Sequence, residues 1–210
     1  MHLQNSKMES QKQVWDKIAE EWNEFRDKPD EKTINFIKSQ KGKLLDLGCG
    51  TGRHFTKSKS EIYAIDFSEE MIKFAKRKAK SLKIKKIKFF VSPATSLPFE
   101  NNFFDSAICT AVLHCIPTKK AREKTLKELF RVLKPKANLR IVVWNKENTR
   151  FKNKPKESFI DWRSKGKRYY YFYTEDELQR ELEEIGFKIV FQKSKIDDIP
   201  HHSITFVVEK

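Results

Sequence analysis

Hydrophobic residues recur along the chain at two spacings, one typical of amphipathic helices and one typical of buried strands. Helical spacing predicts five helices, which are residues 10–24, Glu31–Ser39, Ser68–Leu82, Lys119–Leu133 and Thr174–Gly186. Continuous apolar runs predict seven strands, which are Lys43–Leu47, Glu61–Asp66, Ile87–Val91, Asp105–Cys109, Asn138–Trp144, Phe187–Gln192 and Ser203–Glu209. This alternation predicts an α/β fold with one doubly wound, mostly parallel, seven-stranded sheet and a terminal antiparallel strand pair.

Capping residues mark several boundaries of these elements. Ser68 precedes two glutamates and is expected to cap a helix, and Thr174 forms a capping box with Glu177. Gly186 is a suitable helix terminator. The pattern weakens over Asn145–Lys167, where we expect a long loop of functional importance.

A length of 210 residues is typical of one domain. We expect a single domain over 1–210, with a helical cap over 1–40 and a basic, substrate-side insertion over 145–168. No apolar run is long enough for a bilayer, and Met1–Lys12 lacks the apolar core of a secretory leader. Three cysteines without disulfide or metal-ligand spacing, Cys49, Cys109 and Cys115, indicate a reducing, cytoplasmic location and no metal site.

The charge is strongly basic, with 44 Lys and Arg against 29 Asp and Glu, a net charge of +15. Two segments contribute most of the excess. Lys73–Lys88 is interpreted mainly as the solvated face of a helix. Lys146–Arg168 mixes its cations with aromatic residues, including Phe151, Phe159 and Trp162. Cations interleaved with rings suit a polyanion whose bases stack, so nucleic acid is the first candidate partner.

The strongest chemical signature is a strand that ends in a glycine-rich turn, Leu44–Gly52, with Asp66 twenty residues after Asp46 at the end of the next strand. In a doubly wound sheet both ends face one crevice, where glycines admit a ligand and an acid accepts ribose hydroxyls. Arg53 stands where a dinucleotide fingerprint needs its third glycine. Asp46 suits a cationic amino-acid group better than a pyrophosphate.

The turn resembles motif I of the class I S-adenosylmethionine-dependent methyltransferases, which have a Rossmann-like fold. Further segments follow in the order expected of that family, namely Ser96–Phe99, Phe104–Asp105, Ala111–His114 and Arg131–Pro135. The resemblance implies S-adenosylmethionine as cofactor. The cofactor-binding residues that it implies are Asp46, Gly48, Cys49, Gly50, Gly52, Asp66, Phe67, Ser92, Pro93, Ala94 and Thr110.

A narrower resemblance rests on four further segments, Phe25–Pro29, Ala111–His114, Val143–Trp144 and Lys167–Tyr170 followed by Glu177–Leu178. They are similar to the tRNA wobble-uridine methyltransferases that esterify 5-carboxymethyluridine. The resemblance implies an enzyme that modifies and binds tRNA. It also implies a heterodimer with a small zinc-binding activator subunit, for which the expected edge strand Ile87–Val91 offers a docking site covering Ile84, Ile87 and Phe89.

We expect the catalytic residues to be Arg26, His114 and Arg168. A carboxylate acceptor is ionised at pH 7 and needs orientation rather than a base, and planar guanidinium groups grip carboxylates bidentately. A surface ion pair is the alternative for Arg26, and a place among other cations for Arg168. His114 is expected to face the cleft and bond or stack on the acceptor. Cys115 and Tyr169 complete the expected substrate-binding set.

The chain departs from the family pattern at three places. Cys115 replaces a second histidine, Pro93 replaces an acid that accepts from adenine, and Lys136-Ala137 replaces two glycines. Two alternatives therefore stay open. One is a small-molecule methyltransferase of the ubiquinone-biosynthesis type, and the other is a catalytically weak or non-catalytic RNA-binding scaffold of the same fold.

Overall fold

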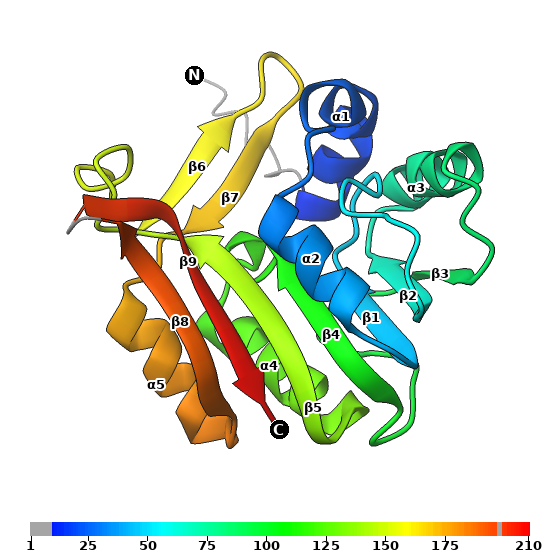
Figure 1. Cartoon of the computed structure of the whole chain (residues 1–210). Helices are drawn as coiled ribbons and strands as arrows, with labels where there is room; N and C mark the ends of the chain where they lie inside the picture. The colour runs from blue at the N-terminus through cyan, green and yellow to red at the C-terminus, as the bar shows by residue number, and fades with distance from the viewer. Residues whose placement is uncertain (1–9, 197–198) are drawn as a thin grey trace.

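A seven-stranded sheet forms the centre of the molecule in the computed structural model, which describes residues 10–196 and 199–210 (Figure 1). Its strand order is β3-β2-β1-β4-β5-β9-β8. β1 to β5 run parallel, and β9 pairs antiparallel with both β5 and β8. The strands of the sheet are β1 (Lys43–Leu47), β2 (Glu61–Asp66), β3 (Ile87–Val91), β4 (Phe104–Thr110), β5 (Leu133–Trp144), β8 (Lys188–Ile196) and β9 (Ile199–Glu209). The predicted fold class and terminal antiparallel pair are confirmed.

Helices cover both faces of the sheet, as Figure 1 shows. The helices are α1 (Gln11–Phe25), α2 (Glu31–Ser39), α3 (Glu69–Ser81), α4 (Lys119–Val132) and α5 (Glu175–Ile185), with a short 3-10 turn, η1 (Leu113–Cys115). α2 and α3 bury Ile37 and Ala75 in one apolar cluster against β1 and β2. α4 and α5 bury Leu129 and Leu182 in a second cluster on the opposite face.

The predicted caps form as the sequence indicates. Ser68 Oγ accepts from the Met71 N–H at 3.1 Å, and the Thr174–Glu177 capping box begins α5. α5 ends at Gly186 with φ of 109°, a left-handed conformation that glycine adopts without strain. Each boundary therefore follows from a hydrogen bond available within a few residues.

The prediction of a long loop over Asn145–Lys167 is wrong, because this segment contains the first strand and the turn of a β-hairpin. β6 (Glu157–Asp161) and β7 (Lys167–Tyr171) pair antiparallel, with Phe159 opposite Tyr169. The turn between them includes Gly166, with φ of 126°. Aromatic residues on β7 form the buried surface of this strand. The many lysines in the segment obscure the alternation of polar and apolar residues that would have predicted the strands.

Strand β5 begins earlier than predicted, at Leu133, directly after α4. The early part is irregular, since the pairing register with β4 shifts between Phe104 and Ser106. Lys136 adopts φ of 66° there, at one of the positions where the family pattern has glycine. The predicted start at Asn138 marks the place where regular pairing resumes.

Hydrogen bonds join the hairpin to α1, a helix within the predicted helical cap of residues 1–40 (Figure 1). The Gln11 side chain accepts from the Tyr169 N–H at 2.8 Å and donates to the Lys167 carbonyl at 3.0 Å. Trp162 Nε1 donates to Glu21 at 2.7 Å. Residues 1–9 of the predicted cap, including most of Met1–Lys12, lie outside the described residues.

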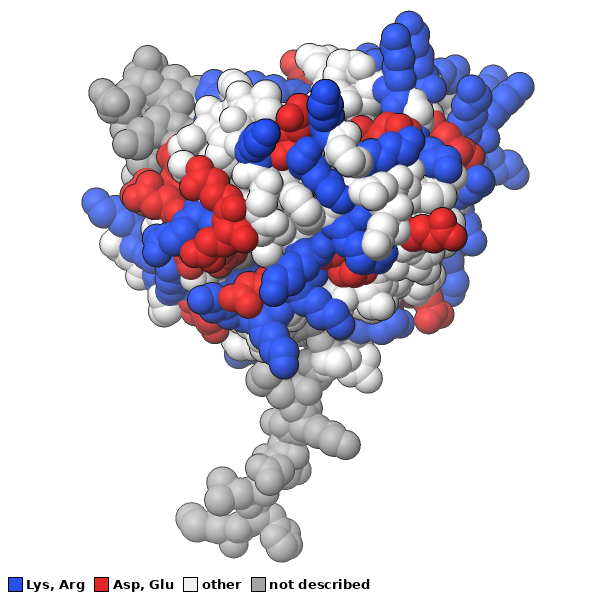
Figure 2. Space-filling view, turned by 90° about the horizontal axis from the view of Figure 1, so that it is seen from below, with Lys and Arg blue, Asp and Glu red and all other residues white. Residues whose placement is uncertain are grey.

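The surface charge is not confined to one region. Figure 2, which views the molecule from the edge where the parallel strands begin, shows Lys and Arg interspersed with Asp and Glu. Part of the basic excess is therefore remote from the carboxyl ends of the strands. Among the described residues, no helix combines the length and apolarity needed to span a membrane.

Candidate functional site

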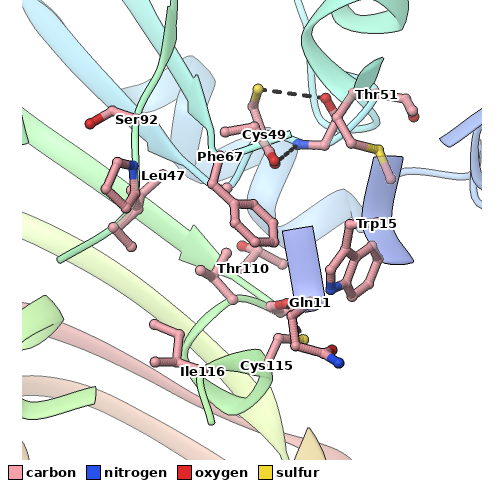
Figure 3. A pocket seen from close by; sticks show the side chains of 18 of the residues that line it. Gln11, Trp15, Leu47, Cys49, Thr51, Phe67, Ser92, Thr110, Cys115 and Ile116 are labelled. Carbon is pink, nitrogen blue, oxygen red and sulfur yellow. Dashed lines mark hydrogen bonds between the residues drawn. The ribbon is translucent and has the colours of Figure 1, made fainter. Parts of the chain in front are cut away.

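A first cavity of about 240 Å³ opens at the carboxyl ends of β1, β2 and β4. Figure 3 shows Phe67 and Thr110 projecting from strand ends, with Trp15 and Gln11 of α1 on the opposite wall. The cavity is lined by Gln11, Trp15, Trp22, Leu47–Thr51, Arg53, His54, Asp66, Phe67, Met71, Ser92–Thr95, Thr110–Val112 and Cys115–Pro117. It is thus enclosed by the sheet edge below and by the N-terminal helix above.

The glycine-rich turn needs left-handed backbone conformations. Gly48 and Gly50 have φ of 68° and 54°. A Cβ atom on Gly48 would lie 2.2 Å from Val112 Cγ2, whereas one on Gly50 would meet nothing closer than 3.9 Å, at Trp22 Nε1. Gly50 therefore presents bare backbone to an open space in which a ligand fits.

Asp66 fixes the turn to the neighbouring strand. Its carboxylate accepts from the Gly50 N–H at 2.9 Å and from the Ser68 N–H at 3.0 Å. Burial raises the pKa of Asp66 to about 6 and, with repulsion from Asp66, that of Asp46 to about 7. Both carboxyl groups thus have a pKa close to neutral pH, and their ionised forms favour a cationic ligand group nearby.

The predicted cofactor-binding residues mostly meet in this cavity. Of the eleven, nine line it, namely Gly48, Cys49, Gly50, Asp66, Phe67, Ser92, Pro93, Ala94 and Thr110. Asp46 and Gly52 lie behind the turn and do not line it. Gly52 has φ of 84° and contacts Phe55, so its part is to shape the turn.

A second cavity of about 390 Å³ adjoins the first, and both are lined by Trp22, Arg53, Thr110 and Ala111. It lies in front of β5 and β9, beside α2. Five basic side chains and one acidic side chain line it, namely Arg26, Lys32, Arg53, Arg140, Lys193 and Asp30. Trp22, His114 and Trp144 supply aromatic walls. This composition suits an anionic ligand that carries a planar ring.

His114 lines the second cavity in a fixed orientation. Its Nδ1 accepts from the Trp144 N–H at 3.1 Å, and burial lowers its pKa to about 3. The ring is therefore neutral, with its proton on Nε2 as a donor. Arg26 also lines this cavity, 5.5 Å from the Trp22 ring, and forms no ion pair with any described residue. None of the residues that the structure describes supplies the surface ion pair that is the alternative for Arg26.

Two predicted residues, Arg168 and Tyr169, line neither cavity. Arg168 is buried on β7, where its guanidinium lies 4.6 Å from the Trp162 ring centre and 5.6 Å from that of Trp22. It donates to Tyr170 Oη at 2.5 Å. Tyr169 is in the apolar core and bonds Arg122. Cys115, by contrast, lines the first cavity.

Several lining residues escaped the sequence analysis. Trp15 and Trp22 lie on the helix that is predicted over residues 10–24, and their face also covers the first cavity. Arg140 is nearly fully buried and bonds Asp30 and Thr33. A charged residue inside the apolar run of β5 was the available signal for it. Within the described part of the chain, no cluster of His, Cys, Asp or Glu could hold a metal ion.

Comparisons with known proteins agree with this geometry. Residues 38–186 match the family described as "Methyltransferase domain". A tRNA (carboxymethyluridine(34)-5-O)-methyltransferase of Arabidopsis thaliana is 33% identical over 137 residues, which are 64% of this chain and 32% of that protein. The matched region thus spans about a third of the length of that relative.

Solved structures share the fold. A SAM-dependent methyltransferase of Methanosarcina mazei superposes with a TM-score of 0.67 at 25% identity, covering 84% of this chain and 96% of that one. A complex between the Haloferax volcanii Trm112 methyltransferase activator and a methyltransferase gives a TM-score of 0.71 at 16% identity, covering 95% of this chain and 96% of that one. At that identity the second likeness concerns the fold alone.

Proposed function

Because this chain belongs to the family of S-adenosylmethionine-dependent methyltransferase domains, we propose that it methylates the carboxymethyl group of a modified wobble uridine in tRNA. The observation that carries the proposal is the cationic, aromatic second cavity, which shares a wall with the first. A carboxylate on a pyrimidine ring matches both features of that cavity. The same proposal has three further parts. The chain binds tRNA, works with a small zinc-binding activator subunit and is located in the cytoplasm.

The first cavity fits the cofactor of this family, S-adenosylmethionine. When bound, this cofactor supplies an electrophilic methyl group on a sulfonium. Gly50 offers open backbone, Asp66 offers a carboxylate for ribose hydroxyls, and Phe67 and Met71 offer apolar contacts for the adenine. Pro93 removes the acid that the family has on this rim, and leaves the backbone groups and the hydroxyls of Ser92 and Thr95 there.

The chain's own residues would then orient the acceptor. An ionised carboxylate attacks without a general base, so alignment supplies most of the acceleration. Arg26 is half-buried and has no ion-pair partner among the described residues, so it would grip the carboxylate, while His114 Nε2–H would donate to the base. Arg168 would act as a positioning residue that keeps Trp22 in place between the two cavities.

The hairpin provides a surface for the rest of the tRNA. Lys152 and Lys154 are exposed in the segment leading to β6. At its turn, Arg163 lies 4.5 Å from the ring centre of Phe25, which is 55% exposed at the end of α1. Cations beside an exposed ring bind the phosphates and bases of an unpaired loop.

The activator would dock at the edge of the sheet. In the described residues β3 pairs with β2 alone, and Val91 on it is 49% exposed. The predicted contacts Ile84, Ile87 and Phe89 are half-buried against the chain's own apolar cluster, so only their exposed parts are open to a partner. Val91→Asp should abolish co-purification with the activator. Val190→Asp, at the opposite sheet edge and 60% exposed, is the matched control.

Methyl transfer is tested with radiolabelled cofactor and total tRNA, with and without a co-expressed activator, followed by nucleoside identification. Label in the methyl ester of carboxymethyluridine, lost in Arg26→Gln, is the expected result. Label in a small-molecule extract instead of RNA would favour the ubiquinone-type alternative. Absence of S-adenosylhomocysteine binding at high micromolar concentration would favour the scaffold.

A further inference from the structure

Two lysine side chains from distant parts of the chain meet in the second cavity. Lys32 lies in the first turn of α2, and Lys193 lies on β8. Both side chains line this cavity, and the proximity of Lys193 is the main reason that the pKa of Lys32 is lowered. Two like charges repel each other, and an anion that binds between them offsets this repulsion.

Among the described residues that line the cavity, Asp30 is the one acid, and its charge offsets part of this repulsion. Asp30, the acidic residue of the lining, is held by Arg140 at 3.1 Å. Among the described residues, none of Arg26, Lys32, Arg53 and Lys193 forms an ion pair. Burial and the nearby Arg26 lower the pKa of Arg53 as well. One acceptor carboxylate at Arg26 and Arg53 would still leave the two lysines without an ion-pair partner among the described residues.

The register of the sheet determines the distance between Lys193 and Trp144, one of the aromatic residues that line the cavity. Lys193 is opposite Thr205, Thr205 is opposite Val142, and Val142 is two residues before Trp144. With strand spacing of about 4.8 Å and a rise of about 3.4 Å per residue, the two Cα atoms lie roughly 12 Å apart. A lysine side chain and the sugar of a nucleotide together bridge such a gap.

We propose that Lys32 and Lys193 bind a phosphate of the nucleotide whose base enters the second cavity beside Trp144, so that this cavity accepts nucleotides and discriminates against nucleosides. This inference rests on the proposed function in taking a uridine as the base. It adds a phosphate subsite, built by α2 and β8, to the carboxylate and base contacts already described. The phosphate on the 5′ side and that on the 3′ side share this chemistry, and the experiment separates them.

The test is equilibrium binding to the full chain saturated with S-adenosylhomocysteine. The probes are uridine, uridine 5′-monophosphate and uridine 3′-monophosphate. We expect one monophosphate to bind at least about tenfold more tightly than uridine, the effect of a single charge-assisted contact. Lys32→Ala and Lys193→Ala should each reduce that preference to less than about threefold. Lys38→Ala, an exposed lysine in the last turn of the same helix, is the matched control.

Equal binding of uridine and both monophosphates would overturn the inference, as would an equal loss in Lys38→Ala. Retained S-adenosylhomocysteine affinity shows that each variant is folded. Because this readout does not depend on methyl transfer, it also distinguishes the two proposals. A nucleotide preference without tRNA methylation would retain the subsite and reject the wobble-uridine acceptor.

Discussion

The backbone N–H of Trp144 donates a 3.1 Å hydrogen bond to Nδ1 of His114, and the two rings stack with their centres 5.0 Å apart. This contact joins the end of β5 to the turn after β4. It also fixes the ring so that its Nε2 proton is the free one. The side chain that is proposed to act on the acceptor is therefore held by the same strand that forms one wall of the second cavity.

His114→Ala should lower stability as well as activity. The substitution leaves the half-buried Trp144 N–H without its partner, which costs about 1–3 kcal/mol. Urea unfolding measures the difference. His202→Ala removes another ring that contacts Trp144, 5.5 Å away, but no hydrogen bond to that N–H, and should cost less.

The cost of His114→Ala should also depend on pH. The pKa of about 3 in the folded chain lies below the ordinary value of 6.5, so below pH 6.5 the unfolded chain binds the extra proton. The contribution of a neutral His114 then declines by roughly 1.4 kcal/mol per pH unit as the pH falls. The gap between wild type and variant should narrow between pH 6.5 and 4.5, and a constant gap would contradict a neutral His114.

Cofactor affinity should weaken as the pH falls from 8 to 5.5. Burial holds the pKa of Asp46 at about 7 and that of Asp66 at about 6, so both become protonated within this range. S-adenosylhomocysteine carries ribose hydroxyls that donate to the ionised Asp66, and an ammonium group that is attracted by the charge of the ionised Asp46 beneath the turn. Calorimetric titration should show up to about a tenfold loss per pH unit for each coupled carboxyl. Asp66→Asn should bind more weakly and flatten the profile, and a pH-independent affinity in the wild type would exclude this coupling.

Gly48→Ala and Gly50→Ala should differ in cost although they lie in one turn. Both have positive φ, so each alanine pays about 1–2 kcal/mol of backbone strain. Only the Cβ on residue 48 also meets Val112, at 2.2 Å, which adds about 1–3 kcal/mol of overpacking. Urea unfolding without cofactor compares the two. A Gly50→Ala variant at least as unstable as Gly48→Ala would contradict this geometry.

Lys136→Gly should stabilise the chain. Lys136 has φ of 66°, and its N–H donates to the Lys210 carbonyl at 2.8 Å, a bond that glycine keeps. Relief of strain, less the entropy that glycine loses on folding, gives a net gain of about 0.5–1 kcal/mol. Ala137→Gly is the control, because its buried methyl group and ordinary φ predict a loss instead. A lower melting temperature for Lys136→Gly would contradict the prediction.

Much of the fold was predictable because its signals are local. β1, β2 and β3 have the predicted bounds, and Ser68 caps α3 as expected. Apolar runs and capping residues depend on neighbours within a few positions. The hairpin β6–β7 was missed because its buried faces are supplied by α1 and η1, which the segment itself does not reveal.

The two arginines illustrate what a pattern leaves open. Arg26 and Arg168 both stand beside aromatic residues, and both were expected at the acceptor. The pairing of β6 with β7 puts Arg168 opposite Ile160, on the face that packs against the tryptophans of α1. Arg26, at the end of α1, faces the second cavity instead. Alternate side chains of a strand point to opposite faces, so a shift of one residue in that hairpin would turn Arg168 away from these tryptophans.

The sequence by itself determined the sheet, the glycine-rich turn and the acid at the end of β2, because each is specified by residues close to one another along the chain. Only the tertiary structure decided which cations share a cavity. Lys32, Arg140 and Lys193 come from α2, β5 and β8, and no spacing relates them. Their convergence depends on how a helix packs on a sheet and in which register strands pair. The lining of the first cavity could therefore be predicted largely from the sequence, whereas the set of cations that line the second cavity depends on the tertiary structure.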